Sequence, residues 1–462
     1  PAAPRPPPPN PVDEAEKVVK EKLDQGGWFN DVTHDELRDI NAQVERLAPD
    51  QRNELVSRLS DGGLKTWAEE ADSWGVLGTG GLDRGEKEGL FKSLAQGLDG
   101  EQLARVSQAF NGETDAKLLG DAIAAHASVQ AKGEFVQRMA GRVEGDAQAA
   151  VQVAKAIGGL KGHAAEVDAA LGSLTDAQLG AVISAAKQEW THTNTGYGGG
   201  GSITVSYEVQ PLRALIDAAA TGSNADLKAK VFELSAKELK TISETNTGLG
   251  IAVMKKGAEE DLTRSLSGLL TSDTNGVMRA LETGYRQGRG ISVFTEHMIE
   301  QGRTDELKVI ADQLKRGNAL NEDPITRFKA QEGDGNERNA QTLGYFVGSV
   351  YAATAKMGRD IDRQTSTFKA IFAGGLSGGK DTLTSLWLSQ PLQKSLAGIA
   401  VGTVGAVGVI AADQIARDMK AGNKDLREGL AEHAFPRDAG GNLFEGEEAE
   451  TAYDAAVGRV ID

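Results

Sequence analysis

The stretch LDGEQLARVSQA at residues 98–109 carries a complete helix-start signal, and the chain repeats its pattern. An apolar residue comes first, a short polar stretch follows, and apolar residues return five and eight positions after the first. Residues 174–185, LTDAQLGAVISA, and residues 234–242, LSAKELKTI, have the same arrangement. In a helix the later apolar residues share one face, and the first packs against the first turn as a staple. The three segments therefore predict three helix starts.

The intervals between these segments are 76 and 60 residues, so the chain matches no repeat family of fixed length. One interpretation is that unrelated helices share good capping chemistry. The other, which we favour, is a degenerate array of helical hairpins, because small helices rich in Ala and Gly need neighbours to bury their faces. Similar start signals occur at Thr33–Glu36, which resembles a capping box, and at residues 47–55, where Pro49 suits a first helical turn.

Proline and glycine usage supports a mainly helical fold. Seven of the 12 prolines lie in residues 1–11, and the remaining five are spread over the rest of the chain, whereas glycine is abundant at 57 residues. Residues 1–12, PAAPRPPPPNPV, predict a polyproline-II arm, because proline removes backbone donors. The predicted fold class is all-α, either an elongated multi-helix bundle or an irregular array of helical hairpins.

One segment breaks the helical pattern. Residues 202–209 alternate apolar and polar side chains, and a run of glycines at 198–201 separates them from the polar segment 190–197. This pattern predicts one small β-hairpin near 190–210, with Pro211 starting the next helix. A phosphate-binding loop is the less favoured interpretation, since such a loop requires a helix directly after the glycines.

Composition excludes several classes of function. The 50 Lys and Arg against 67 Asp and Glu give a formal charge of −17, which repels nucleic-acid phosphates. The absence of cysteine removes disulfides, thiolate metal sites and Cys nucleophiles. The six histidines have no metal-ligand spacing, and residues 332–338 lack the order of a calcium loop. We therefore expect no nucleic-acid partner, no metal and no cofactor. The histidines are His34, His126, His163, His192, His297 and His433.

A single glycine cluster matches catalytic patterns. Residues 375–379, GLSGG, fit the spacing of a nucleophile elbow around Ser377. Residues 374–380 fit the first part of a phosphate-binding loop, but the motif then requires Ser or Thr and the chain has Asp381. Both motifs require a strand directly before them, and residues 365–373 have the pattern of a helix end. We therefore interpret the cluster as a turn between helices and expect no catalytic residues, while an unrecognised helical active site stays an alternative.

The C-terminal third contains an uncharged segment at residues 396–412, LAGIAVGTVGAVGVIAA, between Lys394 and Asp413. At 1.5 Å per residue it would span roughly 26 Å, slightly less than a hydrocarbon core of about 30 Å. A buried core helix is the favoured interpretation, and conditional insertion into a membrane is the alternative. The candidate residues for membrane contact or helix packing are Leu396, Gly398, Gly402, Val404, Gly405, Gly408 and Ile410.

These observations predict six regions. They are a Pro-rich arm at 1–12, an N-terminal helical region at 13–189, a β-hairpin insertion at 190–210, a middle helical region at 211–338, a Gly/Ala-rich apolar helical region at 339–412, and an acidic tail at 413–462.

Several of the helical segments resemble helical regions of secreted effector and toxin-like proteins from plant- and soil-associated proteobacteria. Besides 98–109 and 174–185, the segments that carry this resemblance are 212–220, 228–232, 273–281 and 339–348. The resemblance implies a non-catalytic role in delivery or translocation. The chain departs from such proteins after Ala412, where an acidic tail follows in place of a recognisable toxin domain.

The expected function is therefore that of a secreted bacterial effector or toxin-associated protein that acts by interaction or delivery. The expected partner is a protein: a secretion chaperone, the secretion machinery or a host or target protein. We expect a cytoplasmic stage before export, with no cleavable signal peptide visible in this chain. The alternatives are a membrane-inserting translocator or pore-forming protein that uses 339–412, and an enzyme.

If residues 396–412 insert into bilayers, acidification should promote insertion, because protonated carboxylates weaken both the repulsion from lipid and the internal packing. We expect wild-type protein to float with liposomes at acidic pH, and Val404→Arg to abolish flotation, since a charge at mid-bilayer costs at least about 2.5 kcal/mol. The comparison requires variants that circular dichroism shows to be folded. Absence of flotation at every pH between about 4 and 8 would eliminate the membrane role.

Overall fold

The structure is a computed structural model that describes residues 10–23, 32–73, 80–195, 201–247, 257–285 and 290–316, together with residues 342, 345, 346, 349, 350, 353, 367 and 371. The chain divides into two compact units. Residues 1–190 and 207–223 belong to the first, and residues 191–206 and 224–462 belong to the second. Each unit is built almost entirely of helices in the described residues, so the predicted all-α fold class is confirmed.

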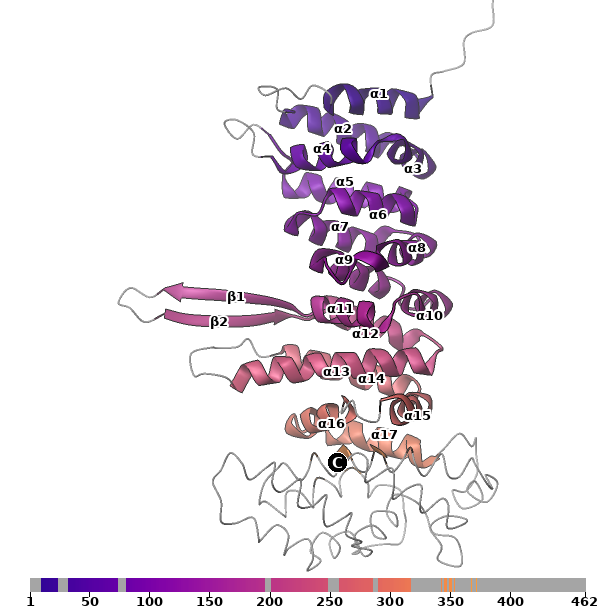
Figure 1. Ribbon diagram of the computed structural model, residues 1–462, viewed down its shortest axis with the longest axis vertical. Helices are drawn as coiled ribbons and strands as arrows, with labels where there is room; N and C mark the ends of the chain where they lie inside the picture. Colours follow the sequence, from indigo (N-terminus) through magenta and orange to yellow (C-terminus); the bar gives the residue numbers. More distant parts are fainter. Residues whose placement is uncertain are drawn as a thin grey trace, which may run out of the picture. The chain divides into compact units, whose positions relative to one another are not determined.

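The helices of the first unit follow one another in chain order (Figure 1). They are α1 (Pro11–Leu23), α2 (His34–Arg46), α3 (Pro49–Arg58), α4 (Asp61–Asp72), α5 (Arg84–Gly97), α6 (Gly100–Ala109), α7 (Glu113–His126), α8 (Val129–Met139), the short 3-10 helix η1 (Ala140–Arg142), α9 (Ala147–Gly158), α10 (Ala164–Gly172), α11 (Asp176–Ala186) and α12 (Gln210–Thr221). The helices of the second unit are α13 (Ala225–Thr247), α14 (Ala258–Ser272), α15 (Thr274–Gly284), α16 (Gly290–Glu300) and α17 (Thr304–Arg316).

In the first unit the helices pack in two rows. Helices α5, α7, α9 and α12 pack successively against one another in one row, and α4, α6, α8 and α10 do so in the other. Helices joined by a short turn therefore lie in different rows, and most contacts join a helix to the one two places further along the chain. This is the predicted array of helical hairpins.

The helix starts depend on local capping, as the repeated pattern predicts. The side chain of Asp99 accepts a hydrogen bond from the N–H of Gln102 at the start of α6. Thr175 and Gln178 form a reciprocal capping box at the start of α11, as do Thr33 and Glu36 at α2. Each such cap satisfies backbone donors that have no partner within the helix.

The third predicted start is wrong. Residues 234–242 lie in the middle of α13, which runs without a break from Ala225 to Thr247. Ser235 is fully buried within this helix. A Ser beside Leu is a start signal only where the preceding residues are not helical, and here residues 225–233 are already helical.

The predicted hairpin is present as strands β1 (Gln188–Thr195) and β2 (Gly201–Glu208), which form a two-stranded sheet (Figure 1). Its base belongs to the first unit, where Lys187 Nζ lies 5.5 Å from the ring centre of Tyr207. There Lys117 Nζ also pairs with Glu208 at 3.2 Å. As predicted, Pro211 lies in the first turn of the following helix, α12.

Two predicted boundaries differ from the structure. Helix α1 begins at Pro11, so the last two residues of the predicted arm are helical. Asn10 caps this helix, since its side chain accepts from the N–H of Val12 at 3.1 Å, and Pro11 has no N–H to leave unpaired. The middle region begins at Asn224 rather than at residue 211, because α12 packs against α9 and α10 in the first unit.

No helix in the described part of the chain is both long and apolar enough to cross a membrane. The predicted apolar segment 396–412, the acidic tail 413–462 and Ser377 lie outside the described residues. The predictions about them, including conditional membrane contact, therefore stay predictions.

Helix α9 of the first unit is buried on nearly every side. It packs against α7, α8, α11 and α12, and every residue from Ala149 to Ile157 is buried. Small side chains permit this close packing. A Cβ atom on Gly158 would lie 2.7 Å from Cβ of Ala214 in α12 and 3.1 Å from its backbone carbon.

Replacing Gly158 with Ala should therefore destabilise the first unit by about 1–3 kcal/mol, because the contacting atoms of α12 include backbone that has to move. The matched control is Gly180→Ala in α11, where a Cβ meets nothing within 4 Å. That change should stabilise by up to about 1 kcal/mol through helix propensity. Urea unfolding followed by circular dichroism measures both, and equal effects of the two substitutions would contradict the close α9–α12 approach.

Candidate functional site

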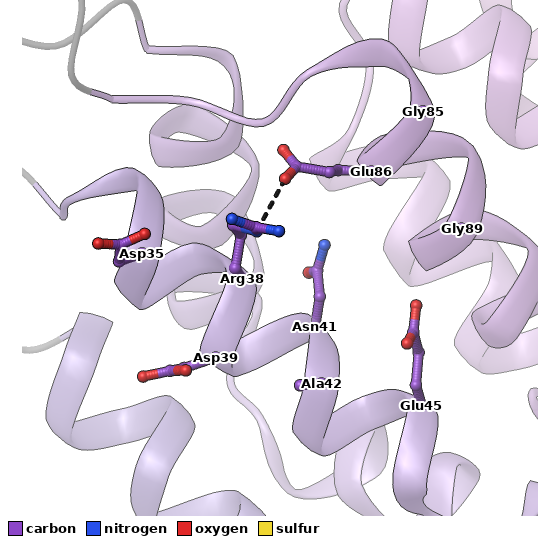
Figure 2. A pocket seen from close by; sticks show the side chains of 9 residues that line it. All are labelled: Asp35, Arg38, Asp39, Asn41, Ala42, Glu45, Gly85, Glu86 and Gly89. Carbon is purple, nitrogen blue, oxygen red and sulfur yellow. Dashed lines mark ion pairs between the residues drawn. The ribbon is translucent and has the colours of Figure 1, made fainter.

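The candidate site is an open groove of about 500 Å³ between α2 and α5 in the first unit (Figure 2). Helix α2 contributes most of the polar side chains, and α5 contributes two glycines and one carboxylate. The lining residues are Asp35, Arg38, Asp39, Asn41, Ala42, Glu45, Gly85, Glu86 and Gly89.

The sequence leaves this space open because α5 carries glycine where it faces α2. Gly85 and Gly89 are one helical turn apart on the groove side of α5 (Figure 2). A Cβ on Gly89 would lie 3.4 Å from Oε1 of Glu45, so the Glu45 carboxylate extends toward this bare part of α5. The groove is therefore bounded by the backbone of one helix and by the side chains of the other.

Glu86 connects the two helices. Its Oε2 accepts from the N–H of Asp83, which completes the capping box at the start of α5. Its Oε1 lies 3.0 Å from Nε of Arg38 and 3.0 Å from Nε2 of His34, both on α2 (Figure 2 shows the Arg38 pair). A carboxylate that is held at a helix N-terminus and contacts two basic groups has a fixed position.

The rest of the lining is acidic. Asp35, Asp39 and Glu45 are exposed on α2, and of these Asp39 pairs with Lys22 of α1 at 3.1 Å. With Glu86 there are four carboxylates in the lining against the single guanidinium of Arg38. This excess of negative charge attracts cations and repels anions at the mouth of the groove.

Asn41 supplies a second, independent observation. Its side chain points into the groove between Arg38 and Glu45 (Figure 2), yet the residue is only 7% exposed. Its Oδ1 atom is buried and has no hydrogen-bond partner among the described residues. A buried acceptor without a donor costs about 1–3 kcal/mol. An N–H group of a ligand would satisfy it once the amide turned its oxygen toward the groove, and carboxylates nearby favour a donor with positive charge.

Two other polar clusters of the first unit are satisfied within the fold. The buried ammonium of Lys87 pairs with Asp115 at 2.7 Å and with Asp72 at 2.6 Å, so it ties α5 to α7 and α4. A second depression, of about 280 Å³, lies where α3, α6 and α8 begin. There Asn53 and Asp99 bond to each other twice, at 2.7 and 2.9 Å. We interpret both clusters as structural.

Sequence reasoning reached only part of this site. It identified the segment Thr33–Glu36 as a helix start and found no metal-ligand spacing for His34. In the described part of the chain, no three or more His, Cys, Asp or Glu side chains are grouped so that they could hold a metal ion. The sequence analysis did not identify Asn41. A signal for it exists, because Asn41 lies on the same buried face of α2 as the apolar residues Leu37 and Ile40.

The structure does not describe the candidate residues that the sequence indicated. Ser377 and the seven candidates between Leu396 and Ile410 lie outside the described residues. Comparison with protein-family models, with curated proteins and with solved structures found no match for the chain.

Replacing Asn41 with Leu, which has a similar size, should raise the free energy of unfolding by about 1 kcal/mol, because it removes a buried acceptor that has no partner. The matched control is Asn53→Leu, which breaks both bonds to Asp99 and should lower the free energy of unfolding by about 1–3 kcal/mol. Denaturant titrations of both variants test this. If Asn41→Leu destabilises as much as the control, the Asn41 side chain is already satisfied within the fold.

Proposed function

We propose that the chain is a non-catalytic interaction protein, and that its first unit binds a Lys- or Arg-bearing segment of a protein partner in the groove between α2 and α5. The observation that carries this proposal is the buried Oδ1 of Asn41, which has no hydrogen-bond partner among the described residues and lies beneath a rim of carboxylates. A buried acceptor that has no donor within the fold lowers the free energy of unfolding. A donor from a bound ligand would restore that stability.

The chemistry of the groove favours a cationic side chain over other ligands. A Lys ammonium or Arg guanidinium supplies N–H donors only, which suits an amide oxygen surrounded by carboxylates. An anionic ligand would meet the repulsion of Asp35, Asp39 and Glu45. The formal charge of −17 also increases the rate at which basic partners reach the surface.

The open shape of the groove supports binding rather than catalysis. A wide groove accepts a side chain that is still attached to another protein, whereas small substrates are usually enclosed. Glu86 is held at a helix terminus by Asp83 and by two basic groups, so it serves as a fixed wall of the site. We therefore assign the groove residues to recognition.

The wider proposal is a secreted bacterial effector or toxin-associated protein, for which a secretion chaperone, the secretion machinery or a target protein would be the partner. Recognition of a basic segment fits each of these partner classes. The resemblance of the helical segments to effector and toxin-like proteins is what supports secretion.

The full-length protein should bind a labelled peptide of alternating Arg and Ser more tightly than its counterpart with citrulline in place of Arg, because citrulline keeps the shape and loses the charge. Fluorescence anisotropy measures both affinities.

Asp35→Asn with Glu45→Gln should weaken binding about three- to tenfold, since exposed ion pairs contribute about 0.2–1 kcal/mol each. Asn41→Leu should weaken it about tenfold without any change of charge.

The control is Glu144→Gln with Glu166→Gln, which removes the same charge from exposed positions on α10 and on the segment before α9. It should change affinity less than twofold. Equal losses in the two double variants would show that the peptide responds to overall charge alone. Unchanged affinity in Asn41→Leu would remove the groove from the proposal.

A further inference from the structure

The second unit buries a carboxyl group at the contact between α13 and α16. Glu233 of α13 is fully buried, and its Oε2 accepts a hydrogen bond of 2.9 Å from the N–H of Gly290, the first residue of α16. A Cβ on Gly290 would overlap Oε2 of Glu233, so only glycine allows this approach. The other oxygen, Oε1, is buried and has no hydrogen-bond partner among the described residues.

Part of the environment of Glu233 is apolar. Phe232 and Phe294 pack edge to face beside it, with ring centres 5.3 Å apart, and join α13 to α16. Ile291, one residue into α16, is also fully buried. An ionised carboxylate in this environment has lost its hydrogen bonds to water. The hydrogen bond from the Gly290 N–H compensates only part of that loss.

Among the described residues, no charged or titratable group near Glu233 neutralises it by an ion pair. Helix α14 buries only neutral side chains, and α15 contributes the buried carboxyl group of Glu282. Helix α16 contributes His297, whose Nδ1 lies 3.5 Å from Glu300. On α13 itself, Lys237 is exposed and acts on Glu233 through its charge, without an ion pair within 4 Å in the described part of the chain.

Tyr345 adds a neutral polar group to this cluster. Its hydroxyl is buried and has no partner among the described residues. Burial, and then the charges of Glu233 and Glu282, raise the pKa of Tyr345, so its hydroxyl keeps its proton. A hydroxyl that stays neutral cannot supply the positive charge that an ionised Glu233 lacks.

We propose that Glu233 is a proton-binding site that fastens α16 to α13, because a protonated carboxyl group keeps its bond to the Gly290 N–H and removes the buried negative charge. The balance is simple: one proton from solvent is added to the carboxylate, and no other bond changes. Acidification would then tighten the second unit. This inference is independent of the groove in the first unit.

The direction of the pH effect follows from the environment. Burial raises the pKa of Glu233 above its ordinary value of 4.5, and the Gly290 N–H and the charge of Lys237 offset only part of that rise. The folded state therefore takes up the proton at a higher pH than the unfolded state. Stability increases as the pH falls through the raised pKa and gains nothing further below about 4.5.

Glu306 in α17 provides a control of opposite sign. Burial raises the pKa of Glu306, but hydrogen bonds from Arg303 and Ser267 outweigh that effect, so its pKa is lowered from 4.5. The stability that this carboxylate contributes is present above 4.5 and is lost only as the pH falls through the lowered pKa. The two groups thus act in separate pH ranges within the same unit.

The test is hydrogen exchange of the α16 amides in the full chain at about pH 5 and about pH 8, after correction for the intrinsic exchange rates. In wild type, protection should be several-fold higher at the acidic pH. Glu233→Gln keeps an acceptor for Gly290 without the charge, so protection should be high at both pH values. Glu306→Gln should retain the wild-type increase. Protection that is unchanged or lower at acidic pH in wild type overturns the proposal, as does an increase that persists in Glu233→Gln.

A second measurement needs no variant and so covers the case in which Glu233→Gln does not fold. Carbon-13 NMR of the Glu233 carboxyl group in the wild-type chain gives its titration midpoint directly. A midpoint above 4.5 supports a proton-binding site, and a midpoint at or below 4.5 overturns it.

Discussion

The close approach of helices around α9 is the constraint on which the first unit depends. A helix that is buried on all sides needs small side chains where its neighbours come nearest, and Gly158 meets Ala214 of α12 at such a point. The polar residues of α9 obey the same constraint. Gln152 and Lys155 are buried, and both donate hydrogen bonds to backbone carbonyls of α7. Their side chains therefore contribute packing without leaving polar groups unpaired.

Cationic side chains join neighbouring helices by bonding to carbonyls at helix ends. Arg52 of α3 donates to the carbonyl of Val44 near the end of α2, at 3.0 Å. Arg105 of α6 donates to the carbonyl of Leu59, directly after α3, at 2.6 Å. Lys132 of α8 bonds in the same way to the C-cap residue of α9, at 2.9 Å. The last carbonyls of a helix have no partner within it and carry partial negative charge, so a cation from a neighbouring helix suits them.

These hydrogen bonds between neighbouring helices explain how hairpins of unequal length can form one array. The side-chain caps act within single helices, and the cations and the close contact at Gly158 act between particular pairs of helices, so no fixed repeat length is required. The same freedom leaves a groove beside the buried Asn41, where Gly85 and Gly89 of α5 face α2. In the second unit, α13 and α16 pack closely where Glu233 meets Gly290, and this packing encloses the carboxyl group. One buried polar group can therefore meet a ligand, and the other can meet only a proton.

The sequence by itself determined the features that depend on neighbours within a few residues. The caps at Thr33, Asp99 and Thr175 and the prolines in the first turns of α3 and α12 all act over three or four positions, so their effects can be predicted from local order. The alternation in 202–209 predicts a strand for the same reason. Together these local signals were sufficient for the all-α class, for the hairpin and for most of the helix starts that the sequence analysis named.

Only the tertiary structure decided the features that join distant segments. Residues 234–242 carry a start signal, but packing of α13 against α14, α15 and α16 holds them inside one continuous helix. The groove needs α2 beside α5, and Glu86 lies 52 residues from His34 in the sequence. Gly290 lies 57 residues from Glu233, so nothing local to either residue predicts their bond. The physical reason is that caps and periodicity are set by backbone geometry within one turn, whereas burial and charge depend on which other segments fold against the residue.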